Sequence, residues 1–185
     1  MENQRLTTDQ FLKYALLFGV VQIVYQLFAY LMGIGYMASL WNVGFSILLN
    51  IAVLVYIMLQ IRNVSGGFIS FRKLFVNTSI VLIFGLFLSV MFDYVLNTVI
   101  DPDLPLKIVE ASFENTLSML EGMGLPDETL DETYAEMEQA KKEIESEYTV
   151  AQFLPAYLIS YGLWTIPNLI LSLILKKEES LFKPE

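Results

Sequence analysis

The 185-residue chain contains no histidine and no cysteine. It therefore lacks the Cys–His pairs and Ser-His-Asp triads of common nucleophilic enzymes, and the usual ligands of zinc and iron–sulfur clusters. Disulfide bonds are excluded too, so cysteine usage does not indicate a redox compartment. An enzyme would have to depend on scattered carboxylates and a serine, and no acid–base pair is evident. We expect no enzymatic activity, no cofactor and no metal site.

Charged residues are also scarce. They make up 17% of the chain, against about 25% in ordinary globular domains, whereas hydrophobic residues make up 55%, against about 45–50%. The mean hydropathy is +0.55, so part of the apolar surface must be covered by lipid rather than by water. The formal net charge of −9 argues against nucleic acid as a partner.

The few charges leave long segments of the chain uncharged. Between Lys13 and Arg62 lie 48 residues without an acidic or basic side chain. A single straight helix of that length would measure about 70 Å, more than twice the hydrocarbon core of about 30 Å. The segment must therefore fold back, and residues 33–39, which include two glycines, are suited to a tight reversal.

Two further segments, 74–100 with the single charge of Asp93 and 148–175, are long enough to cross a bilayer. We predict an all-α integral membrane protein in which four transmembrane helices form a bundle and the lipid bilayer is a partner. The first apolar segment is longer than a usual signal sequence and has no clear cleavage site, so we expect it to be retained. The predicted spans are about 14–33, 41–61, 75–98 and 150–175.

Lysine and arginine are distributed unequally between the two sides of this bundle. Eight of the 11 fall in the two termini and in the connection between the second and third spans. The connection between the first and second spans has none. The positive-inside rule then places both termini in the cytoplasm and residues 101–147 on the extracytoplasmic side.

Residues 101–147 carry most of the acidic side chains. They contain 14 aspartates and glutamates and three lysines, a net charge of −11, whereas the rest of the chain has a net charge of +2. The negative charge of the protein is therefore a property of this one connection.

Apolar residues in this connection recur with helical spacing. One stripe ends at Gly122 and Gly124, and a second follows Pro126, a residue type that favours the first turn of a helix. The stripes are Leu106, Val109, Phe113, Leu117 and Leu120, and then Leu130, Tyr134, Met137, Ile144 and Tyr148. We predict an amphipathic helical hairpin between the third and fourth spans, with a second helix that either ends before the fourth span or continues into it.

The acidic face of the hairpin has several interpretations. It could bind a basic protein partner, mediate self-association of the chain, or collect divalent cations, although the spacing of an EF-hand is absent. The alternative is a solvated face that keeps the hairpin away from anionic lipid headgroups.

Polar residues also lie inside the predicted spans. In lipid, small and polar residues on one helix face support close packing and interhelical hydrogen bonds, each worth about 0.6–2 kcal/mol. The same residues could instead line a polar pathway. The candidate intramembrane polar residues are Gln22, Gln26, Asn50, Asp93 and Asn168.

Asp93 is the one ionisable residue in the interior of these spans. An intramembrane acid is a candidate functional group. However, the spans contain no cationic partner for it, and Asp93 lies near the outer end of its span. We expect a neutral, hydrogen-bonded or water-exposed side chain rather than part of a proton relay.

The connection between the second and third spans contains two adjacent glycines followed by Phe68-Ile69-Ser70-Phe71. Paired glycines favour a turn, and the aromatic and basic residues suit a segment that rests in the lipid headgroups. The spacing is not that of a phosphate-binding loop or a dinucleotide fingerprint.

Three other features accompany this motif in the same order along the chain. They are Asp101-Pro102 after the third span, Glu138-Gln139-Ala140-Lys141-Lys142-Glu143 at the end of the hairpin, and Lys176-Lys177 after the fourth span. Over about residues 10–177 the chain thereby resembles the domain-of-unknown-function 4199 family. The resemblance implies a small four-helix protein of the bacterial inner membrane, common in Bacteroidota, and brings no established reaction, cofactor or catalytic residue.

The residues that match the family motif are Gly66, Gly67, Ser70 and Phe71. They are candidates for a shared structural or binding role, and the structural alternative is a glycine turn that leads into the third span. We expect a non-enzymatic interaction or scaffold protein that presents its acidic hairpin to another protein or to a second copy of itself. The alternative is a small transporter or channel subunit that uses the polar residues inside the bundle.

Overall fold

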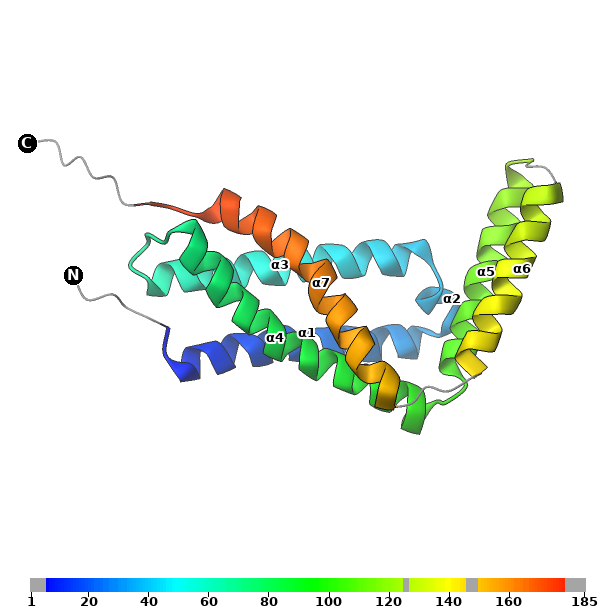
Figure 1. The fold of residues 1–185 in the computed structure, drawn as a ribbon, viewed down its shortest axis with the longest axis horizontal. Helices are drawn as coiled ribbons and strands as arrows, with labels where there is room; N and C mark the ends of the chain where they lie inside the picture. The colour runs from blue at the N-terminus through cyan, green and yellow to red at the C-terminus, as the bar shows by residue number, and fades with distance from the viewer. Residues whose placement is uncertain (1–5, 125–126, 146–149, 179–185) are drawn as a thin grey trace, which may run out of the picture.

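The computed structural model describes residues 6–124, 127–145 and 150–178 (Figure 1). Every element in these ranges is a helix. The helices are α1 (Thr8–Met32), α2 (Ile34–Met37), α3 (Leu40–Val64), α4 (Phe71–Val95), the π-helical turn η1 (Leu96–Ile100), α5 (Leu104–Gly122), α6 (Asp127–Glu145) and α7 (Val150–Leu175).

Within the described ranges, four segments are long and apolar enough to cross a membrane. They are Thr8–Met32, Leu40–Val64, Phe71–Ile100 and Phe153–Leu175. The prediction of an all-α, multi-pass membrane protein is therefore confirmed.

The helices extend beyond the uncharged segments because polar residues cap them. Thr7 Oγ1 accepts a hydrogen bond from the Gln10 backbone N–H at 3.3 Å, and the Gln10 side chain accepts one from the Thr7 N–H at 3.0 Å. This capping box begins α1 at Thr8, before the first predicted span. At α3, Ser39 Oγ accepts from the Asn42 N–H at 3.2 Å in the same manner.

The connection between α1 and α3 contains a glycine turn and a short helix. Gly33 has φ +90°, a conformation that favours glycine, and the one-turn helix α2 follows it. The Tyr25 hydroxyl donates to Asn42 Oδ1 at 2.6 Å and lies 3.4 Å from the Tyr36 hydroxyl. These contacts join α1, α2 and the start of α3.

The four long helices form two pairs that run in opposite directions (Figure 1). Helices α1 and α4 both run from the end that holds the N-terminus towards the end that holds α5 and α6, while α3 and α7 return. Helix α4 packs against α1 on one side and α7 on the other. We call the two ends the loop end, after the α3–α4 loop, and the hairpin end, after α5 and α6.

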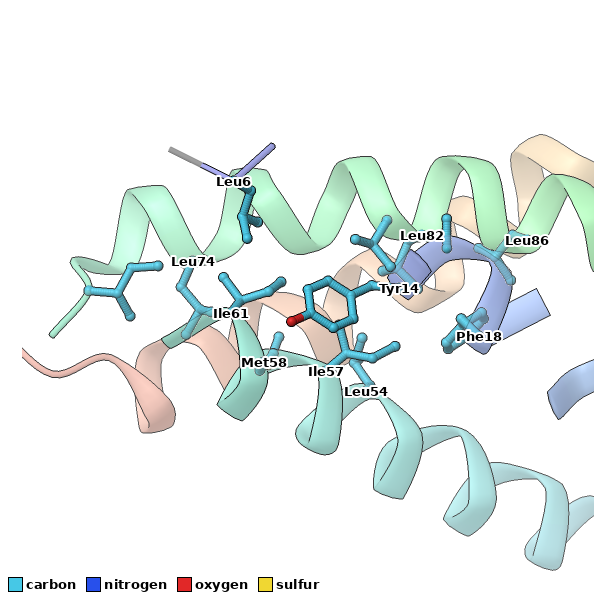
Figure 2. Packing of buried hydrophobic residues seen from close by; sticks show 13 residues of the cluster. Leu6, Tyr14, Phe18, Leu54, Ile57, Met58, Ile61, Leu74, Leu82 and Leu86 are labelled. Atoms are coloured by element: carbon cyan, nitrogen blue, oxygen red, sulfur yellow. The ribbon is translucent and has the colours of Figure 1, made fainter. Parts of the chain in front are cut away.

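The apolar core lies in the half of the bundle nearer the loop end (Figure 2). Helices α1, α3 and α4 each contribute side chains that are almost fully buried. The largest members are Phe18, Leu54, Ile57, Met58, Ile61, Leu74 and Leu82. Towards the hairpin end α3 is much more exposed, since Leu40 and Trp41 are 78% and 82% exposed, as expected of side chains that face lipid.

Two glycines allow α1 and α4 to approach closely. A Cβ on Gly19 would lie 3.0 Å from the Gly85 carbonyl oxygen and 2.8 Å from Leu88 Cδ2. A Cβ on Gly85 would lie 3.1 Å from the Ala15 carbonyl oxygen. Small residues at a crossing are how helices pack in lipid, where burying apolar surface supplies no net drive.

Helices α5 and α6 lie side by side at the hairpin end (Figure 1). Lys141 on α6 forms a 2.8 Å ion pair with Glu110 on α5. Helix α5 also packs on α2, and its Leu104 and Leu117 are buried. Helix α6 ends at Glu145 and a separate helix, α7, begins at Val150.

One residue of the predicted hairpin stripes is misplaced. Tyr134 is 46% exposed, whereas the less exposed positions on α6 include Thr133, Met137 and Ala140. The less exposed face contains a threonine and an alanine, which add little to an apolar pattern, so the apolar spacing points to the neighbouring tyrosine instead. Pro126, Tyr148 and the side chains of Leu130 and Ile144 lie outside the described residues.

Candidate functional site

The predicted intramembrane polar residues occupy three interhelical contacts rather than one site. The first joins α1 to α3. Asn50 Nδ2 donates a hydrogen bond to Gln22 Oε1 at 3.0 Å and another to the Ser46 carbonyl oxygen at 2.8 Å. Both Gln22 and Asn50 are buried.

The second contact joins α1 to α4 one helical turn closer to the hairpin end. Gln26 Nε2 donates a hydrogen bond to the Asp93 carboxyl, which also interacts with the side chain of Asn97. The carboxyl group is therefore supplied with amide donors inside the bundle. Helix α4 ends at Val95, two residues after Asp93, and the π-helical turn η1 follows. The Asp101 N–H donates to the Leu96 carbonyl oxygen of this turn at 2.8 Å.

The third contact joins α4 to α7, and its α4 residue, Ser79, lies 14 residues before Asp93. Asn168 Nδ2 donates to Ser79 Oγ at 2.9 Å, and Asn168 Oδ1 accepts from the Ser172 hydroxyl at 3.3 Å. Asn168 and Ser172 are both fully buried. Sequence analysis did not single out Ser79, because a serine next to Thr78 in an apolar helix carries little signal of its own.

One polar atom in these contacts has no partner. Gln22 Nε2 is buried and makes no hydrogen bond within the described part of the chain. An unpaired buried amide costs free energy, so this atom is a candidate position for an ordered water or a polar ligand.

The base of the hairpin is fixed to the bundle by ionic and polar contacts. Asp101 accepts from Lys107 Nζ at 3.0 Å and from the Tyr30 hydroxyl at 3.5 Å. Asn115 Nδ2 donates to the Ala38 carbonyl oxygen at 3.4 Å. The Asp101 carboxylate raises the pKa of Lys107, because the ion pair favours the charged amine.

The α3–α4 loop holds the family motif. Gly66 and Gly67 have φ values of +81° and +86°, which explains the two glycines, since other residues rarely adopt this conformation. Ser70 occupies the N-cap position of α4, although its side chain makes no capping hydrogen bond. The Phe71 ring stacks on Phe75, with 5.9 Å between centroids.

This loop is joined to the segment after α7. The Ile69 N–H donates to the Lys177 carbonyl oxygen at 2.8 Å, and the Lys177 N–H donates to the Ile69 carbonyl oxygen at 3.0 Å. Lys177 Nζ lies 5.1 Å from the centre of the Phe68 ring. Arg62 Nη1 donates to the Leu175 carbonyl oxygen, the last of α7, at 3.3 Å. We call residues 66–73 and 175–177 together the clasp.

Helix α6 carries an acidic surface. Asp131, Glu132 and Glu136 are exposed, and none of them takes part in an ion pair within the described residues. Glu138 lies 3.9 Å from Lys142. In the described ranges, no group of three acidic residues is placed to hold a metal ion.

Comparison with known proteins gives a family but no relative of known activity. No curated protein sequence and no solved structure matches the chain. A family model described as "Protein of unknown function (DUF4199)" matches residues 13–177. This range includes most of α1, the whole of the other three membrane-length helices, the clasp, and the α5–α6 pair. The chain therefore belongs to the DUF4199 family.

Proposed function

We propose that the chain is a non-enzymatic interaction protein of the bacterial inner membrane that presents the acidic surface of α6 to a basic protein partner. In this proposal both termini and the clasp are cytoplasmic and the α5–α6 pair is extracytoplasmic. The unequal distribution of lysine and arginine supports this orientation.

The observation that carries the proposal is the set of contacts that hold the acidic helix α6 against the rest of the protein. Helix α5 contacts α2, and Asp101 connects Tyr30 of α1 with Lys107. Helix α6 packs on α5 and is held there by the Lys141–Glu110 ion pair. The acidic residues of α6 are therefore held on a fixed support rather than on a free tail.

The charge of α6 favours a basic partner over a second copy of the chain. Glu132 and Glu136 are four residues apart and repel each other modestly. Joining two such surfaces would add further repulsion between like charges. A lysine-rich or arginine-rich surface on a partner would instead reduce the repulsion between the acidic residues. The contact between that partner and α6 would weaken with salt, because exposed charges are screened.

A zero-length carbodiimide tests this proposal, because it joins carboxylates directly to lysine amines in contact. In membranes that contain the protein, we expect an adduct with a different protein that decreases at high salt. The variant Glu132→Gln/Glu136→Gln should lose the adduct. The matched control Glu114→Gln/Glu121→Gln, which removes the same charge from exposed positions on α5, should keep it. An adduct with the mass of two chains, or one that survives in the α6 variant, would reject the basic-partner proposal.

A second candidate function, a small transporter or channel subunit, is supported by one observation. The unpaired Gln22 Nε2 lies on α1 one turn from the Gln26–Asp93 contact. In this proposal the unpaired amide and the carboxyl belong to a polar path along α1. Protein-dependent proton or ion flux into proteoliposomes that falls in both Gln22→Leu and Asp93→Asn would support it, whereas flux that neither substitution changes would reject it.

A further inference from the structure

The clasp keeps the basic segment after α7 close to the α3–α4 loop. Two backbone hydrogen bonds between Ile69 and Lys177 hold the α3–α4 loop and the segment after α7 together. Lys177 is therefore held over the Phe68 ring instead of trailing away from the bundle. Phe68 remains 43% exposed, whereas Phe71, the other aromatic residue of the clasp, stacks on Phe75.

Basic residues outnumber acidic residues on the surface around the clasp. Within the described residues, Lys13, Arg62, Arg72, Lys73, Lys176 and Lys177 lie at the loop end, where the acidic residues are Asp9 and Glu178. Glu178 lies 3.8 Å from Lys176. No ion pair within the described ranges places a carboxylate on Arg72 or Lys177.

Helix stability does not explain the position of two of these cations. Arg72 and Lys73 lie in the first turn of α4, where the helix dipole disfavours positive charge. The presence of Arg72 is explained if negative charge from outside the chain lies near it. The clasp also lies at the ends of three membrane-length helices. When these helices span a bilayer, their ends lie at the depth of the phospholipid headgroups.

We propose that the clasp binds the headgroup phosphate of an anionic phospholipid, with Arg72 and Lys177 as the principal cations and the exposed Phe68 ring in contact with the lipid. The chemistry fits: basic residues next to a membrane attract anionic lipid, and aromatic rings prefer the interface. The clasp is at the opposite end of the bundle from α6, so this proposal stands independently of the basic partner.

Native mass spectrometry of the purified full-length protein tests the proposal directly. The detergent-solubilised protein is titrated with phosphatidylglycerol and with phosphatidylcholine of the same acyl chains. We expect wild type to retain phosphatidylglycerol preferentially. The variant Arg72→Gln/Lys177→Gln should lower this preference about thirtyfold, as expected for two basic residues near an anionic surface.

Three control variants separate lipid binding from folding. The charge-conserving Arg72→Lys/Lys177→Arg should retain the preference, and so should Lys141→Gln/Lys142→Gln, which removes equal charge at the hairpin end. Arg72→Gln alone leaves the Lys177–Phe68 contact in place and should lower the preference by a smaller factor. Equal retention of the two lipids by wild type, or an unchanged preference in both glutamine variants of the clasp, would overturn the proposal. Displacement of phosphatidylglycerol by millimolar inorganic phosphate would also overturn it, in favour of a site for a free anion.

Discussion

Gln26 on α1 donates a hydrogen bond to the carboxyl of Asp93 on α4. The contact pairs Asp93, an acid away from the helix ends, with a polar side chain of the helix beside it. The Asn50–Gln22 and Asn168–Ser79 contacts repeat this arrangement at two other helix interfaces. Each of the five candidate polar residues thus takes part in a hydrogen bond that joins one helix to another.

The Asn168–Ser79 contact should contribute measurably to stability. In a double-mutant cycle with Asn168→Ala and Ser79→Ala, we expect a coupling energy of about 0.5–1.7 kcal/mol, the range found for hydrogen bonds between membrane helices. Reversible unfolding in mixed micelles of a mild detergent and dodecyl sulfate measures it. Strictly additive effects of the two substitutions would contradict the importance of this hydrogen bond.

The crossing of α1 and α4 should tolerate no side chain at Gly19. Gly19→Val places atoms against the Gly85 carbonyl oxygen and Leu88, and we expect a loss of about 1–3 kcal/mol from overpacking. The matched control is Gly44→Ala on α3, where an added Cβ meets nothing within 4 Å. The same unfolding assay compares the two, and equal stability would show that the helices do not meet closely at Gly19.

The glycines of the clasp should be required for their backbone conformation and not for space. An added Cβ at Gly67 meets nothing within 4 Å, but φ is +86°, so Gly67→Ala should cost about 1–2 kcal/mol. Gly35→Ala, at an equally open position where no positive φ is present, should be nearly neutral. Hydrogen exchange provides the readout, because the Ile69 and Lys177 amides should exchange faster only in the Gly67 variant.

The α5–α6 pair should loosen at alkaline pH. Glu110 raises the pKa of Lys141 above the usual 10.5, so the ion pair stabilises the folded pair fully below that pH. The stabilisation is lost as the pH rises through the higher folded-state pKa and the amine loses its charge. Hydrogen exchange of α6 should therefore accelerate above pH 10.5 in wild type more than in Lys141→Gln. An equal acceleration in both proteins would show that the Lys141–Glu110 ion pair does not stabilise the packing of α6 on α5.

The orientation can be determined with engineered cysteines, because the chain has none of its own. Asn63 at the loop end and Glu132 on α6 are both exposed. In intact spheroplasts, Glu132→Cys should react with a membrane-impermeant maleimide, while Asn63→Cys should react only after permeabilisation. The reverse pattern would invert the proposed topology.

The helical membrane architecture was predictable because it depends on long uncharged segments, which are easy to recognise in the sequence. Forty-eight uncharged residues and two further apolar segments require membrane-length helices, and the spacing of leucines in 104–122 corresponds to an observed helix. The helix starts were less predictable because they depend on single capping residues, such as Thr7 with Gln10.

Pairing between distant residues could not be predicted from spacing. Gln22 and Gln26 share one face of α1 by sequence alone, yet one contacts α3 and the other contacts α4. The connection between Ile69 and Lys177 is made by backbone atoms, which no side-chain pattern reveals. The motif glycines were recognised, but their positive φ values and their place beside the end of α7 required the structure.

In the proposed function, α6 is the surface at which this protein meets a partner. A photo-crosslinking amino acid at position 132 on α6, compared in cells with one at the exposed position 119 on α5, tests it most directly. We expect a specific adduct from position 132 that is absent from position 119 and disappears when Asp131 and Glu136 are neutralised. Equal adducts from both positions, or none from position 132, would contradict it.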